Sequence, residues 1–412
     1  MTQGISDAER ARIRAQFPAL AGDTIFLENA GGSQVPKVVA DRIYDYMISS
    51  YVQLGAGYAL SQQATQVVDE AHEFVRLLMN GGDGEVILGP STSALLRMLS
   101  DCYAKTLRPG SAIVVAQTGH EANIGPWKNL ARLGFELRWW EMDPMSYTCS
   151  MDRLNGLLDD SVALVAFPHV SNLLGEIVDV AAISERVHEA GARVVVDGVA
   201  YAPHRSLDVE KWNVDWYAYS TYKVYGPHMG ALWGSRDALA ELTGPNHFFI
   251  PHEEVPYKFE LGGVSHEGCA ALLGLRDYLA FLSDTSDPEA LDRASIERAF
   301  ALMTACELPL QARLIQYLMS RNDVRIIGPA SAGEGRVGTI SFIHESKSSA
   351  DITAFVDQSG IAIRHGHMYA YHLCETAGLD PDDGVVRVSL VHYNTPEEIE
   401  RLITVLDRAF GD

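Results

Sequence analysis

Short apolar runs alternate with amphipathic stretches from about residue 84 to residue 235, and this alternation limits the folds open to the chain. Apolar runs without a polar face are typical of strands that are buried on both sides of a sheet. Helices between such strands connect them in parallel. The pattern therefore predicts an α/β domain whose largely parallel sheet is covered by helices on both faces. The runs are EVILG, AIVVA, VALVAFP, RVVVD, WYAY and GALWG.

The sequence pattern changes after about residue 275, where strand-like and helical segments alternate in an α+β pattern. The last helix is well marked, because Thr395 can act as its N-cap, Pro396 suits its first turn and Glu398 can complete a capping box. Residues 243–263 read as a long loop. We expect an N-terminal segment, 1–23, that packs on the small domain, a large domain, 24–274, and a small C-terminal domain, 275–412.

The charge and the cysteines exclude several classes of protein. The chain has 32 Lys and Arg against 54 Asp and Glu, a formal net charge of -22, which is unsuited to neutralising the phosphates of a nucleic acid. No apolar run approaches the roughly 18–20 residues that span a bilayer, and the N-terminus has no signal-peptide pattern. The five cysteines are scattered, without CxxC pairs or metal-like spacing, as in a reducing compartment. We therefore expect a cytoplasmic protein that binds no nucleic acid, membrane or metal.

Polar residues follow the predicted strands, at the place where open α/β sheets bind ligands, beyond the carboxyl ends of the strands. After EVILG, a hydroxyl-rich turn opens a helix, and such a turn can hold an anion or simply cap the helix. A histidine, an asparagine, an acid and a lysine follow the other strands, and the sequence predicts that they meet at one sheet edge. These residues are Ser91, Thr92, Ser93, His120, Asn172, Asp197 and Lys223.

Lys223 lies between two tyrosines in YSTYKVYGPHMG, where it can extend its ammonium to water or hold a reactive amine. The other residues expected at the same sheet edge favour the reactive alternative. Pyridoxal 5'-phosphate (PLP) chemistry needs a lysine that forms the Schiff base, an acid that pairs with the pyridinium nitrogen, and an anion site for the phosphate. Asp197 and the hydroxyl-rich turn supply the acid and the anion site. The residues therefore predict PLP as the cofactor.

Five longer segments strengthen this prediction, because they occur together and in order. They are FLENAGGSQVP, HEANIGPW, HVSNLLGEIVDVAAISERVHEAGARVVVDGVAYAPH, YSTYKVYGPHMGALWG and RVSLVHYNTPEEIERLI. In order and spacing, over roughly residues 24–408, the chain resembles the class V aminotransferase family of fold-type-I PLP enzymes, on its cysteine desulfurase/selenocysteine lyase branch. The resemblance implies a mainly parallel seven-stranded sheet in the large domain and a homodimer with shared active sites.

The resemblance also implies a role for each residue at a matching position. Lys223 would form the Schiff base, Asp197 would pair with the pyridine nitrogen, and His120 would stack on the ring. Asn172 would contact the phenolic oxygen of the ring, and Arg387 would bind the α-carboxylate of the substrate. The contacts with the phosphate would come from Ser91, Thr92, Ser93, Ser220 and Tyr222.

Three positions depart from the family pattern. Cysteine desulfurases that form a persulfide use a cysteine on an active-site loop, and Tyr369 stands at that position here, in RHGHMYA. Cys374 lies further on in a helix-like stretch, where we expect buried packing. Ala200 stands where the family often has a glutamine that contacts the ring oxygen. Gly263 stands where a threonine of the partner subunit often reaches the phosphate; Ser265 or His266 could replace that contact, or the contact could be lost.

Three functions stay open. The first is a PLP lyase that removes the Cα proton and expels a β-substituent from cysteine or a cysteine conjugate. The second is a class V aminotransferase or an amino-acid epimerase. The third is a scaffold protein without activity, which the intact lysine, acid and arginine disfavour. We expect Arg387, Arg364 and Tyr369 to contact the substrate, whereas His365, His367 and Tyr58 could line its pocket or serve only in packing.

Overall fold

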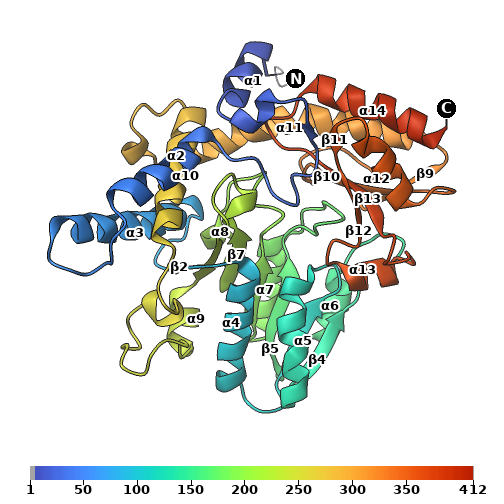
Figure 1. The fold of residues 1–412 in the computed structure, drawn as a ribbon. Coiled ribbons are helices and arrows are strands. Elements are labelled where there is room, and N and C mark those ends of the chain that lie inside the picture. The colour runs from blue at the N-terminus through green and yellow to red at the C-terminus, as the bar shows by residue number, and fades with distance from the viewer. Residues whose placement is uncertain (1–4, 412) are drawn as a thin grey trace.

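A seven-stranded sheet forms the centre of the computed structural model, which describes residues 5–411 (Figure 1). In spatial order its strands are β2 (Glu85–Gly89), β8 (Gly230–Gly234), β7 (Trp216–Ser220), β6 (Arg193–Asp197), β5 (Val162–Pro168), β3 (Ala112–Ala116) and β4 (Glu136–Trp140). β8 runs antiparallel to both of its neighbours, and every other pair is parallel. The predicted mainly parallel sheet of seven strands is confirmed.

One strand of this sheet, β4, has none of the continuous apolar character of the others. It lies at the sheet edge, its sequence is ELRWW, and only its last residue is fully buried. Glu136 and Arg138 pair with each other on it. An edge strand need not be apolar on every side, so its sequence does not form the apolar run by which the other strands are recognised.

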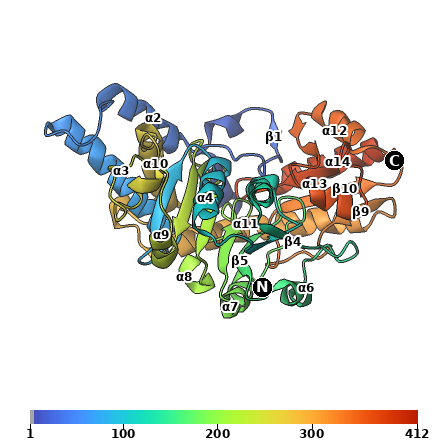
Figure 2. The same cartoon turned by 90° about the horizontal axis from the view of Figure 1, so that it is seen from below.

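Helices cover both faces of the sheet, as the sequence predicts (Figures 1 and 2). Alternate residues of each strand point to opposite faces; in β2, for example, Val86 and Leu88 join one apolar cluster and Ile87 joins the other. The first face is covered by α3 (Ala59–Leu78), α7 (Val180–Glu189), α8 (Val209–Trp212), α10 (His266–Leu282) and α11 (Arg293–Met319). The second is covered by α4 (Thr92–Thr106), α5 (Gly125–Leu130) and α9 (Arg236–Glu241).

The C-terminal region forms a second, antiparallel sheet in the order β12 (Arg364–Gly366), β13 (Val385–Ser389), β10 (Thr339–His344) and β9 (Val324–Ile327). Helices α12 (Ser349–Asp357) and α14 (Pro396–Phe410) pack with it around a separate apolar cluster. The predicted start of α14 is confirmed, because Thr395 and Glu398 form a capping box there.

The remaining elements are short or lie at the periphery. Within residues 5–411 they are α1 (Asp7–Arg14), β1 (Ile25–Phe26), α2 (Lys37–Ser49), α6 (Met151–Leu157), β11 (Ile361–Ala362), α13 (Tyr371–Thr376) and the 3₁₀ helices Pro18–Ala21, Glu121–Asn123, Ala131–Leu133, Thr221–Lys223, Tyr257–Phe259 and Pro288–Ala290. The segment 243–263 is irregular apart from one of these 3₁₀ turns, in keeping with the predicted long loop.

The predicted division of the chain differs from the packing at both of its boundaries. β1 pairs with β11, and Ile25 belongs to the apolar cluster of the C-terminal region, although the prediction places 24–274 in the large domain. The boundary at 274/275 falls inside the continuous helix α10, whose buried residues on both sides of that boundary belong to the apolar cluster of the large sheet. The prediction relied on a local change in the sequence pattern, whereas contacts between side chains far apart in the sequence decide which core a segment joins.

The N-terminal helix α1 contacts the C-terminal region. Arg10 donates to the carbonyl of Asn394 at 2.6 Å, and Arg14 pairs with Glu398 at 2.9 Å. Phe17, just after the helix, packs among the aromatic rings of both regions and belongs to the cluster on the large sheet. The N-terminal segment therefore ties the two regions together.

Across residues 5–411, no helix combines the length and the apolar character that crossing a bilayer requires. The five cysteines are free thiols, and all except the partly buried Cys149 are buried. In the same range, no group of three or more His, Cys, Asp or Glu side chains is arranged to hold a metal ion.

Candidate active site

The predicted site residues lie at one edge of the large sheet, where its parallel strands end. Asp197 is the last residue of β6, Ser220 is the last residue of β7, and Lys223 follows in a 3₁₀ turn. β2 and β7 both pair with β8, so Gly89 and Ser220 end opposite the same residue, Gly230. The sheet therefore brings the turn that opens α4 next to the lysine segment.

A cavity opens at this edge between the strand ends and the helix starts. Small or apolar residues complete its wall, Ala200 among them, which leaves the polar groups concentrated on the predicted positions. The predicted residues that line the cavity are Thr92, Ser93, His120, Asn172, Asp197, Ser220, Tyr222 and Lys223.

Lys223 is buried, and its surroundings make its amine less basic. Burial and, to a smaller extent, the charge of Arg387 lower its pKa to about 8, although Asp197 and Glu28 act in the opposite direction. The backbone on either side is fixed, since Thr221 N donates to Met229 O at 3.0 Å. Near neutral pH, roughly a tenth of the amine is therefore neutral, far more than for an exposed lysine, and can act as a nucleophile or a base.

Asp197 is a buried carboxylate that lacks a cationic partner. Its Oδ1 accepts a hydrogen bond from Val199 N at 3.0 Å, and burial raises its pKa. In the part of the chain that the structure describes, no Lys, Arg or His forms an ion pair with it. A buried carboxylate of this kind is stabilised by a ligand that offers a positively charged N–H.

His120 is neutral near pH 7 and presents a defined tautomer. Its Nδ1 accepts a hydrogen bond from Ala122 N at 3.0 Å, which assigns the ring proton to Nε2. Burial lowers its pKa to about 4, helped by the positive charges of Lys223 and Arg387. A neutral imidazole at the cavity can lie against an aromatic ring without repelling a cation beside it.

Two residues of the hydroxyl-rich turn have different roles, since Ser91 caps α4 and Thr92 lines the cavity. Ser91 Oγ accepts from Ala94 N at 3.2 Å and is the N-cap of α4, so it is not in the cavity lining. Thr92 Oγ1 lies 2.8 Å from Ser220 Oγ, and both hydroxyls face the cavity. A side chain at Gly230 would overlap the backbone nitrogen of Thr92, so a glycine there lets α4 approach the sheet. The start of α4 offers an anion site.

A loop of the C-terminal region rests on the cavity. Asn172 Nδ2 donates to Met368 O at 2.8 Å, and Glu121 N donates to Tyr369 O at 2.8 Å. The Tyr369 ring lies 5.2 Å from the His120 ring, and it is exposed. Asn172 Oδ1 is buried and has no hydrogen-bond partner among the described residues, so it is available to a ligand.

The two predicted substrate arginines are neighbours on the second sheet. Arg364 on β12 pairs in register with Arg387 on β13. Arg387 is buried, donates to Asn172 O at 3.3 Å, and has an Nε without a partner in the described chain. Glu28 contacts both arginines, and the sequence analysis did not single it out. No local signal identifies it, because these partners lie hundreds of positions away.

Other highlighted residues lie away from the cavity. Ser265 caps α10 by accepting from Gly268 N at 3.1 Å. Tyr58 is half-exposed at the start of α3, and His367 contacts Tyr369 rather than the cavity. Cys374 is buried in α13 as predicted, and burial raises its pKa to about 11. None of the five cysteines lines the cavity.

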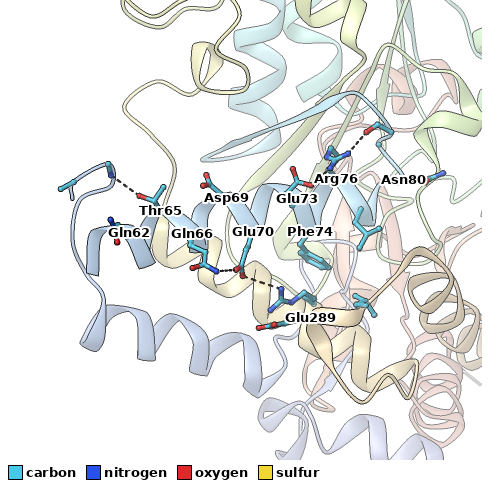
Figure 3. A pocket seen from close by; sticks show the side chains of 17 residues that line it. Gln62, Thr65, Gln66, Asp69, Glu70, Glu73, Phe74, Arg76, Asn80 and Glu289 are labelled. Atoms are coloured by element: carbon cyan, nitrogen blue, oxygen red, sulfur yellow. Dashed lines mark hydrogen bonds and ion pairs between the residues drawn. The ribbon is translucent and has the colours of Figure 1, made fainter. Parts of the chain in front are cut away.

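A larger pocket lies elsewhere, along α3 (Figure 3). Asp69, Glu70 and Glu73 line it together with Arg76 and Arg276, and the described residues of its walls include no lysine or histidine. Glu70 accepts a hydrogen bond from Gln66, and Arg76 pairs with Glu73. Several of the charged groups in this pocket are therefore paired with one another. The described part of the pocket also has no lysine, so it offers no reactive amine like the one in the cavity at Lys223.

The family model for aminotransferase class-V matches residues 25–402, which is most of the chain. The chain belongs to the class-V aminotransferase family. Its relatives include the aminotransferase-like protein FGM3 of Gibberella zeae, which is 40% identical over 96% of this chain and 97% of its own. A cysteine desulfurase of Serratia proteamaculans is 31% identical over 96% of this chain and 97% of its own. The crystal structure of the cysteine desulfurase CsdA from Escherichia coli has a TM-score of 0.82 and 25% identity, and the match covers 97% of this chain and 98% of that one.

Members of this family use PLP, and the predicted cofactor is thereby confirmed. The residues of the cavity fit the cofactor. The unpaired carboxylate of Asp197 suits a pyridinium nitrogen, and the start of α4 suits a phosphate. The orphaned Asn172 Oδ1 faces the same space as the weakly basic amine of Lys223.

Proposed function

We propose that this PLP-dependent enzyme is a lyase that cleaves a C–S bond of cysteine or a cysteine conjugate by β-elimination. One observation carries the proposal: the cavity holds a buried, weakly basic lysine, and none of the chain's cysteines lines it. A persulfide-forming desulfurase needs a thiol that takes sulfur from the substrate. Tyr369 lies on the loop over the cavity, and a phenol cannot take that role.

Each polar group has a place in this proposal. Lys223 would hold the cofactor covalently, and Asp197 would pair with its ring nitrogen. His120 lies against the ring, and Asn172 contacts the oxygen on it. Hydroxyls near the start of α4 hold the phosphate, namely those of Thr92, Ser93, Ser220 and Tyr222. When bound, PLP supplies an electron sink that makes the Cα proton of an amino acid acidic.

The chain's own residues account for the remaining steps. Arg387 binds the α-carboxylate as a two-pronged donor and sets the orientation of the Cα–H bond. The Lys223 amine would be the base that removes the Cα proton. The Cβ–S bond then breaks, its electron pair leaves with sulfur, and the thiolate takes up a proton. Water hydrolyses the released 2-aminoacrylate to pyruvate and ammonium.

Amino transfer is the second candidate, and the similarity to the aminotransferase-like protein FGM3 favours it. It would need the same Cα deprotonation, and PLP would supply a carrier for the amino nitrogen, so that the substrate leaves as a keto acid. Arg387 and Lys223 would have the same tasks in both reactions.

A product screen separates these reactions. The purified holoenzyme is incubated with L-cysteine, L-cystine, S-alkyl cysteines and standard amino acids, with and without a keto-acid acceptor. Stoichiometric thiol, pyruvate and ammonia without an acceptor support the lyase. Keto acid that forms only with an acceptor supports the aminotransferase. L-Alanine together with protein-bound persulfide would contradict both and indicate a desulfurase.

Replacing Asp197 with asparagine is expected to retain the cofactor and to lower kcat. The neutral amide no longer favours a protonated ring nitrogen, so the electron sink weakens. Loss of a charge-assisted contact worth about 1.5–3 kcal/mol implies a decrease of roughly ten- to a hundredfold. Steady-state kinetics with a cofactor absorbance measurement checks this result, and a nearly fully active variant would contradict the role.

We expect the protein to be a homodimer. Large apolar side chains are exposed together on α2 and just after it, and two phenylalanines are exposed on the 243–263 loop. Exposed apolar groups in such numbers are typical of a protein interface. They are Tyr44, Met47, Ile48, Tyr51, Phe248 and Phe249. Light scattering coupled to size exclusion should give twice the 45.1 kDa chain mass, and a fully active monomer would contradict the expectation.

A further inference from the structure

Glu28 lies between the two arginines that are expected to contact the substrate. Its Oε1 is 3.2 Å from Arg364 Nε and 3.5 Å from Arg387 Nη2. The backbone beside it is anchored to β13, since Ser389 N donates to Leu27 O at 2.7 Å. The Glu28 side chain is only about one quarter exposed, at 25%. Its carboxylate is therefore held in a fixed position between Arg364 and Arg387.

The turn after Glu28 is shaped to hold this carboxylate. Gly31 N donates to Glu28 O at 3.0 Å, so the chain folds back on itself. A Cβ atom at Gly31 would overlap the Glu28 carboxylate, Oε1 most closely. At the next position, a Cβ on Gly32 would make only an ordinary contact with the Tyr222 ring at 3.4 Å. The absence of a side chain at Gly31 therefore matters for where Glu28 lies.

The charges at the site add up to a small positive value. Two guanidinium groups and one carboxylate give +2 − 1 = +1, which a single α-carboxylate neutralises. Arg387 Nε is buried without a partner, so this arginine still has a donor for a substrate. Arg364 is more exposed, at 57%, and Glu28 already occupies its Nε. A second anionic group of a substrate, if it approached Arg364, would therefore lie next to the negatively charged carboxylate of Glu28.

We propose that Glu28 is a specificity-determining residue that restricts the site to amino acids with one carboxylate and an uncharged side chain. It does so by repelling a second anionic group that Arg364 would otherwise bind. The inference rests on the proposed function only in that it takes Arg387 as the anchor of the α-carboxylate. It deepens that function, because it selects neutral cysteine conjugates over sulfinates and other acidic amino acids.

The test measures binding without turnover. Borohydride-reduced holoenzyme, whose cofactor is fixed to the chain, is titrated calorimetrically with propionate and with succinate, which differ by one carboxylate. The wild type is expected to bind succinate no more tightly than propionate. In Glu28→Gln, the affinity for succinate relative to propionate should rise roughly tenfold, equivalent to about 1.4 kcal/mol. An unchanged ratio would overturn the inference.

Two further variants keep this test specific. Gly31→Ala pushes the carboxylate away and should raise the same ratio, and the double variant with Glu28→Gln should raise it no further than Glu28→Gln alone. Glu185→Gln removes an exposed acid on α7 and should leave the ratio unchanged; an equal rise there would show a general effect of net charge and overturn the inference. Melting temperatures of all variants identify any loss of folding.

Arg387→Ala separates this inference from the proposed function. It should lose binding of both ligands if Arg387 is the anchor. Retained binding of both would overturn the anchor and the inference together. Lost binding in Arg387→Ala, with an unchanged ratio in Glu28→Gln, would overturn the role of Glu28 alone.

Discussion

Lys223→Ala is expected to abolish covalent retention of PLP and to lower kcat by about a thousandfold or more, because one amine both holds the cofactor and moves the Cα proton. Borohydride treatment of the wild type should fix the cofactor on a peptide that contains Lys223, as identified by mass spectrometry. Lys258 is a natural control, since it is also buried but donates to the carbonyls of Leu239 and Leu242. An adduct on Lys258, or on any other lysine, would refute the assignment.

The protonation of Lys223 adds a pH dependence to the same experiment. Only the neutral amine attacks the aldehyde of the cofactor, and the pKa of this lysine is lowered to about 8 by burial and by Arg387. The rate at which apoprotein captures PLP should therefore rise with pH, with its midpoint near pH 8. Arg387→Ala removes a positive charge, so its midpoint should lie at a higher pH. An identical midpoint in both proteins would mean that the arginine does not act on the amine.

Arg387→Ala is expected to lower kcat/KM by about a hundredfold or more, mainly through KM, since a charged hydrogen bond contributes about 1.5–3 kcal/mol and a two-pronged contact has two. Cys374→Ser should change kcat/KM by less than about twofold and cost about 1–3 kcal/mol of stability, because a hydroxyl replaces a buried thiol. Steady-state kinetics and thermal denaturation of both variants give these values.

A larger loss of activity in Cys374→Ser than in Arg387→Ala would indicate that the protein is a desulfurase. If Cys374→Ser abolished turnover and a persulfide were trapped on Cys374 in the wild type, α13 would have to open during the reaction. In the structure, Cys374 is fully buried within an apolar cluster that includes Leu173 and Val385. The burial that raises the pKa of its thiol to about 11 also leaves almost no thiolate near neutral pH.

Local patterns in the sequence were enough to predict six strands of the sheet and the meeting of most of the candidate site residues at its edge. Buried parallel strands must be apolar throughout, so EVILG and RVVVD could be recognised without any partner. The carboxyl ends of parallel strands share one edge, and this geometry predicted that His120, Asn172, Asp197 and Lys223 would meet. The capping box of α14 was equally local, since Thr395 and Glu398 are three residues apart.

The tertiary structure decided what depends on contacts between distant segments. Edge strand β4 carries no apolar run, and the core that Ile25 joins is set by its pairing with Ile361. The hydroxyl of Thr92 lies beside that of Ser220 because Gly230, which has no side chain, lets α4 approach the sheet closely. The contact of Glu28 with Arg387 spans 359 positions of the chain, and residue types alone contain no signal for it. Such contacts arise only when two separately predictable segments pack together, because packing, rather than local preference, determines their distance and their charge environment.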